Sequence, residues 1–201
     1  MPARESLSRS EARTLQQRER ILKAARSCFV KHGFRTASMA KIAEAAGMSP
    51  GLIYRYFDGK NAIILAIIEQ QLEDARKDIA ALAPDVDLVP LFEQLFTDWQ
   101  RGDCELMNPA LLLEMTAEAT RDPQIAQALA AADRVTGSDL NDWLRKMAEN
   151  EGRTPSSRDI AARSFLLRCL LGGLALRAIR EPELDPQVLN DALKLIPHVL
   201  L

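Results

Sequence analysis

One stretch, SMAKIAEAAGMSPGLIYRYFDGK from Ser38 to Lys60, constrains the fold of this chain more than any other. Apolar residues in its first part recur at the spacing of one buried helix face, and Ser38 can cap that helix. Gly47 follows, where a left-handed backbone ends a helix at little cost. Ser49 and Pro50 then suit the cap and the first turn of a second, short helix. Two helices joined by a tight glycine turn are typical of a helix-turn-helix unit, whose second helix reads the major groove of DNA.

Together with the segment before it, this stretch resembles the DNA-binding head of the TetR family of one-component transcriptional repressors. The resemblance covers about Arg20 to Lys60, and beyond Ala66 only the helical character and the overall length are similar. The residues that match in register are Ile21, Ala24, Ala25, Phe29, Gly33, Phe34, Ser38, Met39, Ile42, Ala43, Ala46, Gly47, Ser49, Gly51, Ile53, Tyr54, Tyr56, Phe57 and Lys60. The resemblance implies a DNA-binding domain over residues 11–60 and a ligand-binding and dimerisation domain over residues 61–201.

The charge distribution agrees with a DNA-binding head. The whole chain carries a net charge of −2, which alone argues against a nucleic-acid-binding protein. Residues 1–60, however, hold 12 Lys and Arg against 5 Asp and Glu (+7), whereas the remainder holds 14 against 23 (−9). A basic segment beside an acidic one indicates docking of one end on phosphate. The alternative is that several of these arginines lie in a solvated N-terminal tail.

The whole chain is predicted to be all-α, with about nine helices, because no stretch alternates convincingly as a strand. A three-helix helix-turn-helix head is expected to precede a larger helical body. The helices beside the helix-turn-helix pair are expected over about 11–31, 60–82, 88–100, 106–120, 122–150, 157–180 and 187–198. Gly33 is expected to end the first of them.

The segment Ser157–Arg180 is apolar over most of its helical circumference, so both sides should be buried. Its Gly172-Gly173 pair is unfavourable in mid-helix and suggests close approach of another backbone. The resemblance implies that it forms a homodimer interface with Gln187–His198. The alternative is an ordinary central core helix.

The residue types of the head predict how it contacts DNA. Arg55 can make a bidentate contact to guanine, beside Pro50, Gly51 and Leu52 facing base edges. Phosphate contacts are expected from Thr36, Ser38, Tyr54, Tyr56 and Lys60, and groove-edge contacts from Ala40 and Lys41. The alternative for the two tyrosines is ring packing, which does not exclude a hydroxyl contact.

The body is expected to bind a small-molecule effector, as the resemblance implies. Large, soft or apolar candidates for lining its pocket are Phe92, Phe96, Trp99, Leu111, Met115, Trp143, Met147, Phe165 and Cys169. Glu114 and Glu118 are candidate counter-charges for a flat organic cation. The alternatives are that the large residues are core and that the acids face solvent.

Other classes of protein find no support in the sequence. It contains none of the motifs of nucleophilic, phosphate-binding or metal-dependent enzymes, so an enzyme is not expected. Three separated cysteines and two histidines support no metal site or disulfide, and no cofactor is expected. Neither a signal peptide nor a membrane span is predicted, so we expect a cytoplasmic protein.

The functional prediction is therefore a ligand-responsive repressor of a (pseudo)palindromic operator. The predicted effector is hydrophobic, with a cationic aromatic molecule as one form, and the predicted target is an efflux gene. The alternatives are a metabolic operon controlled by a polar metabolite, and a DNA-binding activator.

Overall fold

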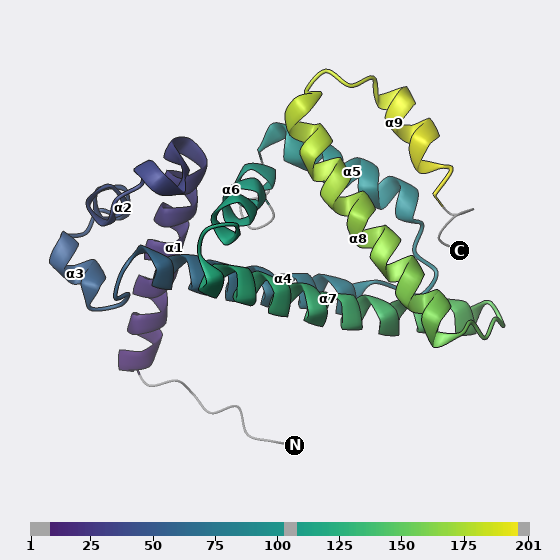
Figure 1. Ribbon diagram of the computed structural model, residues 1–201, viewed down its shortest axis with the longest axis horizontal. Coiled ribbons are helices and arrows are strands. Elements are labelled where there is room, and N and C mark those ends of the chain that lie inside the picture. Colours follow the sequence, from purple (N-terminus) through teal and green to yellow (C-terminus); the bar gives the residue numbers. More distant parts are fainter. Residues whose placement is uncertain (1–8, 103–107, 197–201) are drawn as a thin grey trace.

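The computed structural model describes residues 9–102 and 108–196, which form nine helices and confirm the predicted all-α fold. Figure 1 shows the head at one end of the molecule and two long helices, α4 and α7, lying side by side along its length. The helices are α1 (Arg9–Thr36), α2 (Met39–Ala46), α3 (Pro50–Tyr54), α4 (Lys60–Ala81), α5 (Leu88–Arg101), α6 (Pro109–Ala119), α7 (Pro123–Asn150), α8 (Ser157–Arg180) and α9 (Pro186–Leu193).

The predicted caps of the helix-turn-helix unit are confirmed. The Ser38 hydroxyl accepts from the Lys41 N–H, and the Ser49 hydroxyl accepts from the Leu52 N–H, each at 3.3 Å. Gly47 takes the left-handed conformation (φ 61°, ψ 39°) that ends α2. The second helix ends two residues earlier than expected, at Tyr54. The reason is a tighter turn, in which the next N–H groups bond to carbonyls three residues back.

Gly33 interrupts α1 as predicted. Its backbone (φ 72°, ψ 159°) lies in a region that only glycine adopts readily, and one further turn continues to Thr36. This break turns the chain from the long part of α1 toward α2. The turn is stabilised by the Ala37 N–H, which donates to the Gly33 carbonyl at 3.1 Å.

Several body helices have the predicted bounds, and two differ. The segment Ser157–Arg180 is helical throughout, and α7 begins at Pro123 after an Asp122 cap. The helix expected from residue 106 begins at Pro109, because the Asn108 side chain caps it; residues 103–107 lie outside the described ranges. The helix expected to reach His198 ends at Leu193 in tight turns, and residues 197–201 are likewise outside those ranges. No helix in the described ranges has the length and apolarity to cross a membrane.

The described residues form two hydrophobic cores, and the boundary between these cores does not fall at residue 60. The first core joins the head to half of the body: the apolar side chains of α1, α2 and α3 pack with Ile63, Ile64, Ile67 and Ile68 of α4, Leu111 and Met115 of α6, and Ile125 of α7. The second core lies among α5, the later part of α7, α8 and α9, and includes Phe92, Phe96, Trp99, Leu140, Trp143, Leu144, Met147, Ile160, Leu167, Leu189 and Leu193. The helices α4 and α7 therefore link a head-bearing core to a core that carries α8 and α9. The boundary predicted between residues 60 and 61 separates a DNA-binding part from a ligand-binding and dimerisation part, and this division of roles remains a prediction.

Candidate functional site

The predicted DNA-contacting residues lie on α2, on α3 and at their flanks. Tyr54 is 52% exposed and Arg55 is also exposed, and the position of a side chain on Gly51 would meet no atom within 4 Å. The other exposed members are Thr36, Ser38, Ala40, Lys41 and Pro50, whereas Leu52, Tyr56 and Lys60 are half-buried. The Ser38 hydroxyl caps α2 as an acceptor, so its own proton is available to a phosphate. The face thus combines small groups, hydroxyls and one exposed guanidinium.

Lys60 has a second role that the sequence did not reveal. Its ammonium donates to the Phe34 carbonyl and, at 3.3 Å, to the Ala37 carbonyl. It thereby fastens the turn between α1 and α2 to the first residue of α4. An ammonium has three donors, so a phosphate contact through the remaining one stays a prediction.

Three arginines of α1 make contacts within the protein that hold the head together. Arg18 donates to the Tyr56 carbonyl at 2.8 Å and places its guanidinium 4.3 Å from the centre of the Phe57 ring. Arg20 donates to the Gly47 carbonyl at 3.4 Å. Arg26 is buried and donates to Glu19 and to the α4 side chain Gln70. Part of the basic excess therefore stabilises the head and its junction with α4.

An apolar pocket of about 240 Å³ lies where α4, α5, α6, α7 and α8 converge, and we call it the seam pocket because it separates the two cores. Ile68 and Met115 of the first core face it from one side, and Trp99 and Ala175 of the second core from the other. Its remaining lining residues are Gln71, Leu72, Ala75, Leu112, Leu129, Ala132, Asp133, Thr136, Leu171 and Gly172. A mostly apolar cavity with a few polar groups is the usual form of a small-molecule site.

The charge of the seam pocket is balanced. Among its described lining residues the one carboxylate is Asp133, which accepts from the Arg168 guanidinium at 2.5 Å. Gln71 and Thr136 supply neutral polar groups. The seam pocket therefore favours a largely apolar, uncharged ligand over an ion.

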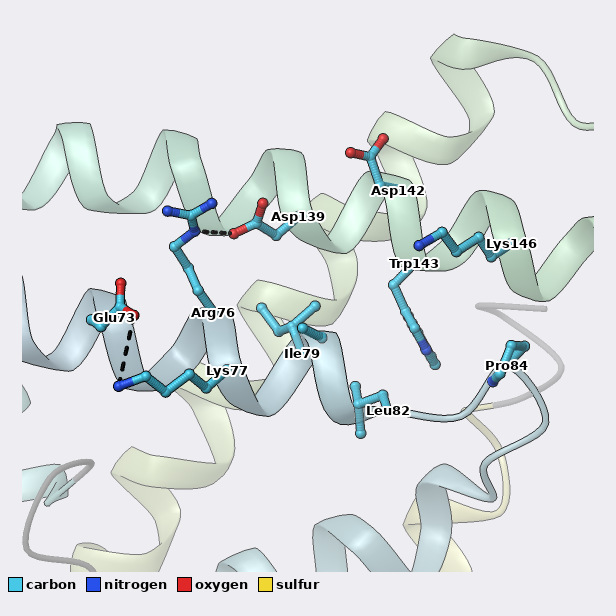
Figure 2. A pocket seen from close by; sticks show the side chains of 11 residues that line it. Glu73, Arg76, Lys77, Ile79, Leu82, Pro84, Asp139, Asp142, Trp143 and Lys146 are labelled. Carbon is cyan, nitrogen blue, oxygen red and sulfur yellow. Dashed lines mark hydrogen bonds and ion pairs between the residues drawn. The ribbon is translucent and has the colours of Figure 1, made fainter. Parts of the chain in front are cut away.

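A second hollow, of about 440 Å³, lies on the outer surface of α4 and α7, and we call it the outer groove. Figure 2 shows the Trp143 ring extending from α7 toward Leu82 and Pro84, with charged side chains along the rim. Arg76 pairs with Asp139 across the groove at 3.0 Å. The outer groove is thus more polar than the seam pocket, and the two tryptophans of the chain lie in different hollows.

The predicted ligand-binding residues are not gathered in one place. Trp99 and Met115 line the seam pocket, and Trp143 lines the outer groove. The other large residues are either in the first core (Leu111), in the second core (Phe92, Phe96, Met147) or exposed on α8 (Phe165, Cys169). Neither predicted counter-charge lines the seam pocket or the outer groove: Glu118 lies 3.8 Å from Arg121, and Glu114 accepts at 2.7 Å from the Phe34 N–H of the head.

Much of the seam pocket lining was missed by sequence reasoning. Ile68, Leu72, Leu129, Leu171 and Ala175 carry ordinary apolar helix periodicity, which predicts burial but not contact with a void. The sequence signals at this site are the predicted pocket residues Trp99 and Met115, together with Gly172, where the absent side chain leaves space on α8.

Large apolar side chains are exposed on α8, on α9 and just after α9, and we call them together the apolar face of α8 and α9. Phe165 is 58% exposed, and Leu166, Ile179, Val188 and Leu195 are exposed as well. Side chains built at Gly172 and Gly173 would meet nothing within 4 Å, so the close neighbour predicted for these glycines is not part of the described chain. Several large exposed apolar groups on these two neighbouring segments of the chain favour an interaction surface.

Comparison with known proteins agrees with this geometry. Residues 21–67, which span the head and the start of α4, match the model for bacterial regulatory proteins of the tetR family. The transcriptional regulator UidR of Escherichia coli K12 is 30% identical over 158 residues, which cover 78% of this chain and 79% of UidR. The chain belongs to the TetR family.

Other relatives extend the similarity of this TetR-family chain over almost its whole length. A transcriptional repressor of Mycobacterium tuberculosis is 28% identical over 190 residues, covering 94% of this chain and 95% of the repressor. The structure of Salmonella enterica GusR superposes with a TM-score of 0.71 at 29% identity, covering 90% of this chain and 95% of GusR. The protein is thus a transcriptional regulator and not an enzyme, and family membership implies an operator and a small-molecule effector as partners.

Proposed function

We propose that this protein is a dimeric repressor that releases its operator when a largely apolar small molecule enters the seam pocket. One observation supports this most: the seam pocket separates the core that carries the DNA-binding head from the core that carries α8 and α9. A ligand in that position contacts both cores, so it can change the position of the DNA-binding head relative to the part that sets the spacing of two heads. Repression, rather than activation, follows the named activity of the Mycobacterium tuberculosis relative.

DNA reading is assigned to the exposed face of α3. Arg55 makes the bidentate base contact, because its exposed guanidinium matches the O6 and N7 acceptors of guanine. The Tyr54 hydroxyl and the Ser38 hydroxyl at the start of α2 bind phosphates on either side. The half-buried Tyr56 and Lys60 contribute to this set with one polar group each while they also hold the head together.

Dimerisation is assigned to the uncovered apolar face of α8 and α9. The exposed Phe165 and Val188 would be buried there, and Gly172 and Gly173 would let the two copies of α8 approach closely. A two-fold interface of this kind presents two heads to half-sites about 34 Å or somewhat more apart.

The switch follows from the placement of the seam pocket. A ligand that fills it contacts α6 through Leu112 and Met115, and α8 through Leu171 and Ala175. If it fits a wider separation of these helices more tightly, it moves the head relative to the dimer face. The ligand must bind the DNA-incompetent arrangement more tightly, because equal affinity for both arrangements shifts nothing.

The effector we propose is a neutral aromatic or aliphatic molecule. Asp133 is already paired with Arg168, so a cationic ligand would have to compete for that carboxylate. Glu114 and Glu118 do not line the seam pocket, so neither is placed to act as its counter-charge. An apolar effector suits control of an efflux gene, and a pump gene beside the operator would support this target.

The two tryptophans allow each hollow to be tested separately. The Trp143→Phe variant keeps only Trp99, which reports on the seam pocket, and Trp99→Phe keeps only Trp143, which reports on the outer groove. We expect a neutral naphthalene dye to quench Trp99 and to release a duplex that the protein selects from a random DNA pool. Positively and negatively charged dyes of the same shape are expected to bind more weakly.

A polar metabolite in the outer groove is the second candidate, favoured by the charged rim around Trp143. In that case polar compounds would quench Trp143 in the Trp99→Phe variant and release DNA, while the neutral dye would do neither. That result would replace the seam pocket as the effector site.

A further inference from the structure

The α1–α2 turn of the head is held on opposite sides by two different helices. Glu114 of α6 accepts a hydrogen bond from the Phe34 N–H at 2.7 Å, and Lys60 of α4 donates to the Phe34 carbonyl. The same carboxylate lies 3.3 Å from the position that a Cβ on Gly33 would occupy. A single buried residue of the head, Phe34, is therefore fixed to α6 through its backbone N–H and to α4 through its backbone carbonyl.

The helix that carries Glu114 also forms a wall of the seam pocket. Leu112 and Met115 line the pocket, and Glu114 lies between them in sequence but points to the head. The helix α6 is short, from Pro109 to Ala119, and its start is capped by Asn108. Because the three residues lie on one helix turn, a displacement of α6 by a ligand would carry Glu114 with it.

We propose that Glu114 is a positioning residue that transmits occupancy of the seam pocket to the DNA-binding head. It does so by tying the Gly33–Phe34 turn to α6, so that the head follows this helix when a ligand displaces it. The inference rests on the proposed function. It makes α6 a second connection between the seam pocket and the head, which can be tested separately from the connection through α4. Glycine at position 33 serves this contact, because a side chain there would press against the carboxylate and strain a positive φ.

A double-mutant cycle tests the link without an identified effector. Ala132→Leu on α7 and, separately, Ala75→Leu on α4 each place extra carbon atoms in the seam pocket and substitute for a bound ligand. Each is combined with Glu114→Ala, which removes the acceptor, and with Glu114→Gln, which keeps a carbonyl oxygen of the same reach. Glu118→Ala, one turn further along α6 where the carboxylate pairs with Arg121, is the matched control. Thermal unfolding selects the variants that fold.

We expect the pocket-filling substitutions to weaken binding to the selected duplex about tenfold in the parent protein and by less than about threefold in the Glu114→Ala background. Glu114→Gln should restore most of the response, and Glu118→Ala should leave it unchanged. Equal weakening in the parent and in the Glu114→Ala background would overturn the link while the seam pocket stands. Folded pocket-filling variants that bind the duplex as tightly as the parent would instead overturn the seam switch itself, and the link with it. Faster amide exchange at Phe34 in Glu114→Ala, but not in Glu118→Ala, is expected from the loss of its acceptor.

Discussion

The two hydrophobic cores differ in how completely one chain closes them. In the first, Ile21, Ala25, Phe29, Ile42 and Ile53 have no exposed surface, and the helix ends around them are capped. The second core is equally well buried at Phe96 and Leu193, but the outer side of its α8 and α9 leaves Phe165 and Val188 exposed. The seam pocket lies between the two cores.

This difference assigns two roles, DNA reading and dimer formation, to the two cores. A closed core holds the head in one shape, so that α3 presents the same face to every operator. An exposed apolar face favours binding of a second copy of the chain, so we expect the second core to be fully covered only in the dimer. A switch placed between them can change the relation of the two parts without unfolding either.

The largest expected effect is on the closed core. Phe29→Ala removes a ring that has no exposed surface and lies 4.4 Å, between ring centres, from Phe34. It should lower the free energy of unfolding by about 3–5 kcal/mol, measured by urea denaturation, and abolish operator binding. Phe96→Ala in the second core is the control, with a similar stability cost. If folded Phe29→Ala protein kept its operator affinity, the head would not depend on a closed core.

The next effect concerns the open face. Phe165→Asp should weaken the dimer by about 2–4 kcal/mol, because an unpaired carboxylate replaces a large apolar side chain at the proposed interface. The stability of the single chain should change little, since Phe165 is mostly exposed. Sedimentation of the variant beside Phe165→Leu, which keeps an apolar group, measures this. A parent protein that is monomeric at micromolar concentration and still binds its operator fully would contradict the proposed dimer.

The sequence was most informative where local rules decide the structure. Ser38, Gly47 and Ser49 have side-chain or backbone properties that fix helix ends without help from distant residues, and all three act as expected. The bounds of α8 followed from its long apolar segment, and the Ser156 side chain caps its start. The family resemblance added the order of the parts, which helix patterns alone do not contain.

The candidate effector site was much less accessible from sequence. A pocket exists where packing is incomplete, and periodicity reports only that Leu72 or Leu129 is apolar. Glu114 was predicted as a counter-charge, whereas its partner is a backbone N–H 80 residues away in the chain. Such a contact depends on how α6 packs against α1, which no local pattern contains.

A smaller effect is expected at the DNA-reading face, which the closed core supports. Arg55→Ala should weaken binding to the selected duplex by about 1–3 kcal/mol and relax the preference for guanine at one position of each half-site. Lys60→Ala should weaken binding to all sequences alike and reduce the salt slope. It should in addition destabilise the head, since its ammonium bonds to two backbone carbonyls. Equal changes in base preference for Arg55→Ala and Lys60→Ala would contradict the assignment of base and phosphate contacts.

The smallest perturbation uses two cysteines as reporters of the two regions. Cys28 is buried in the first core, where burial raises the pKa of its thiol although Lys31 and Lys41 partly oppose this shift. Its S–H donates to the Lys41 carbonyl at 3.7 Å. Cys169 lies on the open face of α8. In a Cys104→Ser background, iodoacetamide should therefore modify Cys169 readily in dilute protein and leave Cys28 almost untouched until the protein unfolds.

Concentration and pH sharpen this last comparison. If α8 and α9 form the dimer, modification of Cys169 should slow as the concentration rises through the dimer dissociation constant, whereas Cys28 should not respond. A rate at Cys169 that is independent of concentration, in protein shown to be dimeric, would place the interface elsewhere.

For Cys28 the raised pKa means that the thiol in the folded state keeps its proton at a pH where the thiol in the unfolded state has lost it. Stability should therefore fall as the pH rises through the ordinary thiol range, and Cys28→Ala should remove that part of the pH dependence, measured by urea denaturation.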